Sequence, residues 1–227
     1  MLDEMRWRWA DVAARTGSSV HPSVTWASAS GRDDESDVPF PDGWRASPPE
    51  EGWFDPAVLA ALTEHLARAT STPDDLVAGF WDGWSDLSGG STLAFGWQGD
   101  DAPCAEERAE VRQFMAVRTA EHRRDQDAIT SSLSVPRFAW PGRGLILAAT
   151  DLPTLADPTW LEHTRLGPLV PLEHTPQMLW PEDHAWVMAS EIDWDSTVVA
   201  GSRSLVDAVL ADERFEASEV AEDNSPS

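Results

Sequence analysis

The sequence contains no lysine and no tyrosine, and both absences exclude chemistry. A phosphate-binding loop of the usual type and a Schiff-base enzyme each need a lysine, and other enzymes use a tyrosine as their general acid. These classes do not fit the chain. No other motif in the sequence indicates a cofactor, so we expect none.

Cysteine and long apolar runs are also scarce. Cys104 is the single cysteine, so the chain can form neither an intrachain disulfide nor a cluster of cysteine zinc ligands. The longest purely aliphatic run, residues 145–149, is far too short to cross a bilayer. The amino terminus has no apolar stretch of signal-peptide length. We therefore expect a cytoplasmic protein.

Positive charge is the third shortage. Sixteen arginines stand against 40 aspartates and glutamates, which gives a net charge of −24 at pH 7. Such a chain repels the phosphates of nucleic acids and the headgroups of anionic membranes. We expect neither as a partner, and predict that the ligand is a protein or a small molecule.

The length and the apolar content of the chain suit one hydrophobic core. With 227 residues, 41% of them hydrophobic, we predict an α+β fold in which an antiparallel sheet of about five or six strands carries two or three helices mainly on one face. Residues 55–220 form the predicted α+β domain. Residues 1–54 are expected to form an N-terminal helix and a surface loop that pack on this domain. Residues 221–227 are expected to form a disordered acidic tail.

Periodicity and turn signals place the individual elements. Helices are predicted at 6–16, 56–69, 105–129 and 203–211, and strands at 20–27, 76–84, 92–97, 135–140, 143–149, 185–192 and 196–200, with an edge strand ending near residue 220. The remainder, notably 31–56 and the proline-rich 151–181, is predicted as loop. In the strand 185–192, alternation predicts that Trp186, Met188 and Ile192 are buried against the helix 56–69 or 203–211.

Tryptophans beside carboxylates mark a candidate ligand site. Most of the 13 tryptophans are expected in the core, but Trp84 and Trp180 each lie by a turn and could stack on a ligand. The predicted ligand-binding residues are Trp81, Asp82, Trp84, Arg143, Trp180, Asp183, Glu191 and Asp193. We expect Trp84 or Trp180 to share a depression with one of these acids, and Arg143 to lie close enough to pair with an acid.

An acidic cluster, formed by Glu182, Asp183, Glu191, Asp193 and Asp195, has two interpretations. If residues 191–195 were one strand, their carboxylates would lie about 7 Å apart on one face, which suits a divalent metal or a glycoside hydrolase using Glu191 and Asp193. Solvated turn residues are the simpler interpretation in so acidic a chain. We therefore predict no bound metal and a non-enzymatic binding module for a partner protein or small ligand. A carbohydrate-directed hydrolase is the alternative.

Three motifs resemble those of a group of uncharacterised actinobacterial proteins. They are Trp81-Asp-Gly-Trp84, Pro141-Gly-Arg143, and a segment from Trp180 to Ser202 that reads Trp-Pro-x-Asp-x-Ala-Trp, then Ile-Asp-x-x-Ser-Thr, then Gly-Ser. The resemblance spans about residues 55–220. No activity is established for that group, so the resemblance implies an intact domain and no mechanism.

Overall fold

A computed structural model describes most of the chain. The described residues are 8–22, 24–32, 36–84, 87, 111–118, 120, 124, 136–140, 142–166 and 170–220. Within these ranges, no helix is long and apolar enough to cross a membrane. The chain divides into two compact units: unit 1 comprises Met1–Phe80, Ala149–Trp160 and His174–Ser227, and unit 2 comprises Trp81–Ala148 and Leu161–Glu173.

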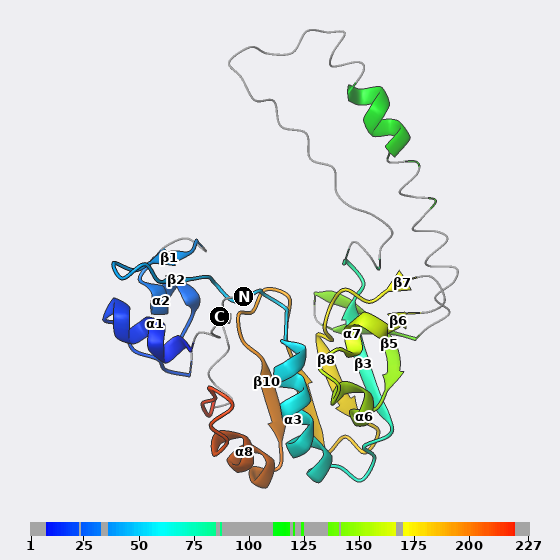
Figure 1. Cartoon of the computed structure of the whole chain (residues 1–227). Coiled ribbons are helices and arrows are strands. Elements are labelled where there is room, and N and C mark those ends of the chain that lie inside the picture. The colour runs from blue at the N-terminus through cyan, green and yellow to red at the C-terminus, as the bar shows by residue number, and fades with distance from the viewer. Residues whose placement is uncertain are drawn as a thin grey trace. The chain divides into compact units, whose positions relative to one another are not determined.

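A six-stranded antiparallel sheet with the strand order β10-β9-β8-β3-β5-β4 is the main element (Figure 1). Its strands are β3 (Leu76–Trp81), β4 (Arg137–Trp140), β5 (Arg143–Thr150), β8 (Met178–Pro181), β9 (Trp186–Ala189) and β10 (Val198–Gly201). The α+β prediction and its number of strands are confirmed. The predicted hairpin in the 185–200 region is β9–β10, and the predicted pair around residues 141 and 142 is β4–β5.

Helix α3 (Pro56–Arg68) covers one face of the sheet in unit 1 (Figure 1). It begins where the sequence predicts, because the Asp55 carboxylate accepts hydrogen bonds from the first backbone N–H groups and proline occupies the first helical position. Its buried leucines face the sheet, and the indole Nε1 of Trp186 in β9 donates to the carbonyl of Leu66 at 3.1 Å. Met188 is fully buried, whereas Ile192 is half-buried and lies in a turn beyond β9. The predicted burial of Trp186 and Met188 is therefore confirmed.

Two further helices of unit 1 pack against α3. They are α6 (Leu152–Leu155) and α8 (Arg203–Leu210). The hydroxyl of Ser202 caps α8 by accepting from the N–H of Leu205. The Leu205 side chain lies against Gly201 on the side of the sheet that carries Trp186. Helix α8 therefore packs on the same face as α3.

Residues 8–46 build a small layer with its own core. It contains α1 (Trp9–Thr16), α2 (Trp26–Ser30) and a short hairpin of β1 (Val38–Pro39) with β2 (Arg45–Ala46). The core consists of Val12, Trp26, Val38 and Ala46, flanked by Trp9 and Phe40. The predicted strand at 20–27 is wrong, because Thr25 forms a capping box that starts α2. The predicted loop 31–56 is largely irregular, apart from the two short strands.

Carboxylates from much later in the chain cap both helices of this layer. Glu216 accepts from the N–H groups of Trp9 and Ala10 at the start of α1, at 2.6 and 2.7 Å. Asp195 accepts from the N–H of Trp26 at the start of α2, at 2.9 Å. A carboxylate at a helix N-terminus satisfies orphan donors and opposes the positive end of the helix dipole. These contacts attach residues 8–30 to the segments beyond β9.

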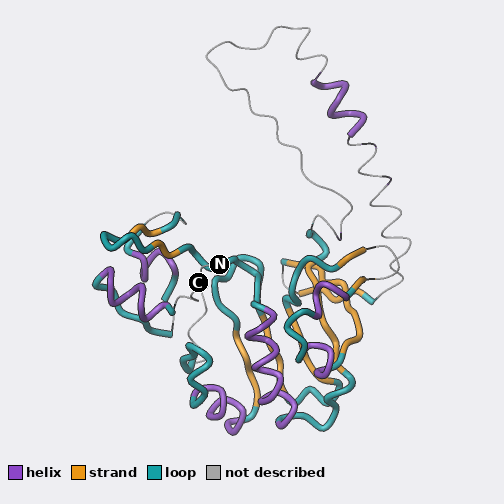
Figure 2. Tube along the Cα trace, viewed as in Figure 1, coloured by secondary structure: helices purple, strands orange, loops and turns teal. Residues whose placement is uncertain are grey.

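The stretch 151–181 contains more regular structure than the sequence predicts (Figure 2). In addition to α6, it forms α7 (Trp160–His163), the pair β6 (Arg165–Leu166) with β7 (Val170–Pro171), and β8. Residues 216–220 have no regular structure, so the edge strand near 220 is also wrong. The predicted strand 92–97 lies outside the described residues. Of the predicted helix 105–129, residues 111–118, 120 and 124 are described, and they are helical.

Candidate functional site

The two faces of the unit 1 sheet differ in burial. Residues directly opposite each other in an antiparallel pair lie on the same face, so the register assigns each strand residue to one face. On the face that carries α3, all residues of β3, β8 and β9 are buried: Leu76, Ala78, Phe80, Leu179, Pro181, Trp186 and Met188. This face forms the core of unit 1.

The opposite side, termed the open face, remains partly accessible. It consists of Val77, Gly79, Met178, Trp180, Val187, Ala189, Val198 and Ala200. Ala200 is exposed, Gly79 is buried, and the other six are half-buried. None is polar or charged, although 25% of the residues in the chain are charged. The open face is thus an apolar surface four strands wide, with Trp180 as its largest side chain.

Acidic residues flank the open face at both ends of its strands. Asp75 precedes Val77 by two residues, and Glu182 follows Trp180 by two residues, with the N–H of Glu182 donating to the carbonyl of Asp75 at 2.9 Å. Glu191 and Asp193 follow β9 at the other end. The stretches 69–80 and 174–202, which form these strands and their turns, contain two and five acidic residues and no arginine or lysine.

Four of the eight predicted site residues come together in unit 2. The guanidinium of Arg143 lies over the ring of Trp81 at 5.5 Å from its centroid, and Trp81 meets Trp84 edge to face at 5.2 Å. The carboxylate of Asp82 accepts from Arg137 Nη1 at 3.0 Å. The ion pair recorded at Asp82 thus comes from Arg137, a residue that the sequence prediction did not include.

Exposed aromatic side chains on β4 extend this cluster. Phe138 and Trp140 are each 39% exposed, with ring centroids 6.5 Å apart. Trp140 lies directly opposite Arg143 in the β4–β5 pair, so the two side chains share a face. The sequence signal that could have identified these residues is the alternation of large aromatics in a short strand next to the Pro141-Gly142 turn.

Asp183 has a structural role in unit 1. Its carboxylate accepts from the N–H and the hydroxyl of Ser71, both at 2.7 Å, from the hydroxyl of Thr70 at 2.8 Å and from the N–H of Ala185 at 3.1 Å. These donors, those of Ser71 first, hold the pKa of Asp183 well below its usual range. The carboxylate thereby fastens the β8–β9 turn to the segment that follows α3.

Replacing Asp183 with asparagine is expected to destabilise the protein at neutral pH. Because the pKa of Asp183 is lower in the folded chain than in the unfolded chain, its hydrogen bonds stabilise the fold fully above pH ~4 and progressively less as the pH falls below that value. The difference in the free energy of unfolding between wild type and Asp183→Asn should therefore become smaller as the pH is lowered. Urea unfolding at a series of pH values measures it, with Asp74→Asn as the exposed control. A difference in unfolding free energy that stays constant from pH 7 to the lowest pH would contradict this role of Asp183.

The remaining acidic candidates lie in a turn. Residues 192 and 193 form the turn after β9, so residues 191–195 are not one strand and their carboxylates do not form a row. The N–H of Asp193 donates to the Glu191 carboxylate at 2.9 Å, and Asp195 caps α2. Burial raises the pKa of Asp195. Within the described ranges, no three His, Cys, Asp or Glu side chains are grouped in a way that could hold a metal ion.

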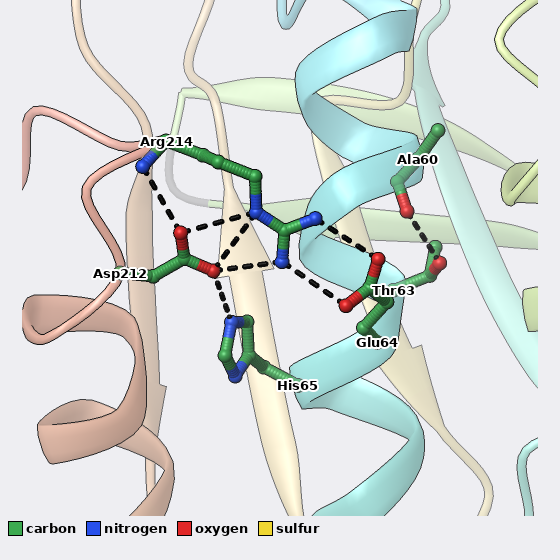
Figure 3. A network of polar contacts seen from close by, with 6 residues as sticks. All are labelled: Ala60, Thr63, Glu64, His65, Asp212 and Arg214. Carbon is green, nitrogen blue, oxygen red and sulfur yellow. Dashed lines mark hydrogen bonds and ion pairs between the residues drawn. The ribbon is translucent and has the colours of Figure 1, made fainter.

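A polar network that sequence reasoning missed joins α3 to the segment after α8 (Figure 3). Arg214 forms a bidentate pair with Glu64, at 2.9 and 3.1 Å, and also binds Asp212. His65 Nε2 lies 2.7 Å from Asp212, while its Nδ1 is buried without a hydrogen-bond partner. Because a carboxylate only accepts hydrogen bonds, Nε2 is the donor in the contact with Asp212. Arg214, with His65 as the second donor, lowers the pKa of Asp212.

Among the described residues, Thr63, the hydroxyl residue close to His65 in sequence, does not complete a hydrolytic triad with this His–Asp pair. Thr63, the hydroxyl residue two positions before His65, donates to the carbonyl of Ala60 at 2.7 Å and so is not turned to the imidazole (Figure 3). The residues around the pair link helix to loop through charged contacts. The network therefore fits a structural role in holding the segment 212–214 against α3.

No family model, no curated protein and no solved structure matches this chain. The function must be inferred from the chain's own residues.

Proposed function

We propose that the chain is a cytoplasmic, non-enzymatic binding module, and that its ligand is a partner protein that docks on the open face. The observation that carries this proposal is the apolar composition of that face. An antiparallel sheet that is packed on one side normally presents polar residues on the other. Contiguous accessible apolar surface on a protein marks a site of interaction.

The dimensions of the open face favour a protein over a small molecule. Four strands at a spacing of about 4.8 Å make a surface roughly 14 Å wide between the outer strands. Small ligands prefer concave pockets that enclose most of their surface, whereas protein partners bind across broad surfaces. Trp180 lies on β8, one of the two inner strands of the four, and a tryptophan in such a position is the type of residue that contributes most to binding at protein interfaces.

The competing proposal is a carbohydrate-directed hydrolase that uses Glu191 and Asp193. It requires two carboxyl groups that face each other across a substrate. The hydrogen bond from the N–H of Asp193 to the Glu191 carboxylate supports a role of Glu191 in forming the turn. Glycoside turnover that disappears in Glu191→Gln while the fold persists would favour the hydrolase.

Partner capture with two matched tryptophan variants tests the binding proposal. Tagged wild type, Trp180→Ala and Trp140→Ala are each expressed in the native cells, and the retained proteins are quantified by mass spectrometry. We expect Trp180→Ala to reduce the amount of a specific retained protein by about tenfold or more, because a central tryptophan commonly contributes at least about 2 kcal/mol. Trp140→Ala, which changes an exposed tryptophan of unit 2, should retain it at the wild-type level.

The two variants separate the possible outcomes. If Trp140→Ala loses the retained protein and Trp180→Ala keeps it, the binding site lies at the aromatic cluster of unit 2. Equal retention by all three proteins would contradict docking on the open face. Thermal unfolding of each variant confirms that the effect does not come from misfolding.

A further inference from the structure

We infer that the partner presents a basic surface, with lysine or arginine side chains on both sides of an apolar ridge that covers the open face. This inference rests on the proposed function, since it specifies the chemistry of the partner at the same site. It comes from the distribution of charge around the face. The apolar residues there carry no information on charge.

The two stretches that form the strands of the open face carry charged side chains of one sign. Residues 69–80 contain two acidic residues and residues 174–202 contain five, and neither stretch contains arginine or lysine. Asp75 and Glu182 directly continue the rows of Val77 and Trp180 at one end of the face, and both are exposed. Asp193, also exposed, follows β9 at the other end. A partner that covers the apolar rows therefore brings its own edges close to carboxylates at both ends.

A second copy of the chain is a poor occupant of this face. Each copy carries a net charge of −24, and face-to-face packing would bring two acidic borders together. Like charges placed opposite each other at an interface cost several kcal/mol. Nucleic acids and anionic lipids are repelled for the same reason. A cationic protein gains attraction at both ends and buries the apolar rows between them.

The same charge distribution should accelerate association. Opposite surface potentials steer two proteins toward the correct orientation, and the effect weakens as salt screens the charges over about 10 Å. Removing acids from the ends of the open face should therefore weaken capture more than removing the same number of acids elsewhere. This difference distinguishes a basic partner from one that is held by apolar contact alone.

Site-specific photo-crosslinking in the native cells tests the inference. A benzoylphenylalanine is placed at Val187 on the open face or, as a control, at Leu210, which is 37% exposed on α8. Adducts are purified under denaturing conditions and sequenced by mass spectrometry. We expect an adduct specific to Val187 whose crosslinked segment contains more lysine and arginine than aspartate and glutamate.

Charge variants are combined with the crosslinker at Val187. The border variant is Asp75→Asn, Glu182→Gln, Asp193→Asn, and the control variant with the same change in net charge is Glu50→Gln, Asp207→Asn, Glu213→Gln. We expect the border variant to lower the adduct yield by about tenfold and the control variant by less than about twofold at physiological salt.

Each other outcome has a defined meaning. A Val187-specific adduct with a neutral or acidic segment, with a second copy of this chain, or with equal sensitivity to both charge variants overturns the inference and leaves docking on the open face standing. The absence of any adduct specific to Val187 contradicts the proposed function, and the inference with it.

Discussion

Replacing Leu179 with alanine should lower the free energy of unfolding by about 2–5 kcal/mol, whereas replacing its neighbour Met178 should cost only about 1 kcal/mol. Leu179 is fully buried on the face that carries α3. Truncating it removes buried apolar surface and leaves a cavity. Met178 lies on the open face and is half-buried, so its truncated site is filled by water. Urea unfolding with a shared m-value measures both changes.

This pair of variants tests the asymmetry of the sheet before any partner is known. Equal losses of unfolding free energy in Met178→Ala and Leu179→Ala would mean that both faces of the unit 1 sheet are packed in the folded chain. The open face would then be unable to receive a partner. A small cost at 179 would instead contradict the assignment of that face as the core.

The second large effect is expected at Gly52. Its φ of +65° lies in the left-handed region, and a Cβ atom there would come within 2.7 Å of the Cα of Ile192. Both the backbone strain and the contact with a main-chain atom oppose any side chain, so Gly52→Ala should destabilise the protein by about 3 kcal/mol or more. Gly52 also joins the loop before α3 to two other segments. Its N–H donates to the carbonyl of Trp194 at 3.0 Å, and its carbonyl accepts from the Gln177 side chain.

Gly43 provides the matched control. Its φ is +87°, but a Cβ atom there would meet nothing within 4 Å. Gly43→Ala should therefore cost only the left-handed strain, about 1–2 kcal/mol. The difference between the two variants in chemical denaturation isolates the contact with Ile192. Identical costs would show that the loop before α3 relaxes away from the turn after β9.

Local signals in the sequence predicted much of the fold. The Asp55-Pro56 start of α3, the alternation through Trp186 and Met188, and the turn before β5 each have a physical cause that acts within a few residues. For that reason they could be identified without the structure. Fold class, the number of strands and the β9–β10 hairpin followed from such signals.

Elements that depend on distant contacts could not be predicted in this way. Strand β8 is four residues long and ends in proline, so its sequence resembles a loop, and only its pairing with β3 and β9 makes it a strand. Thr25 was placed in the predicted strand 20–27, but its hydroxyl caps α2. The first N–H of α2 donates to Asp195, which lies 169 positions later in the chain.

The candidate site shows the same limit. Trp81, Asp82, Trp84 and Arg143 are four of the eight predicted ligand-binding residues, and they lie together in unit 2. Asp183, chosen for its charge, is fully occupied by donors that include Ser71, a residue 112 positions away. The open face could not be recognised, because it requires knowing which residues oppose each other in four strands. Only Trp180 among its members was singled out from the sequence.

The cap that Glu216 provides for α1 forms late relative to the synthesis of that helix. The acceptor for the first N–H groups of this helix lies 206 and 207 positions later in the chain. Because translation runs from the N-terminus to the C-terminus, α1 obtains this cap only after at least 206 further residues have been synthesised. Until then α1 has its contacts with α2 but lacks this cap, so the layer formed by residues 8–46 is completed only after the segment that follows α8 has been synthesised.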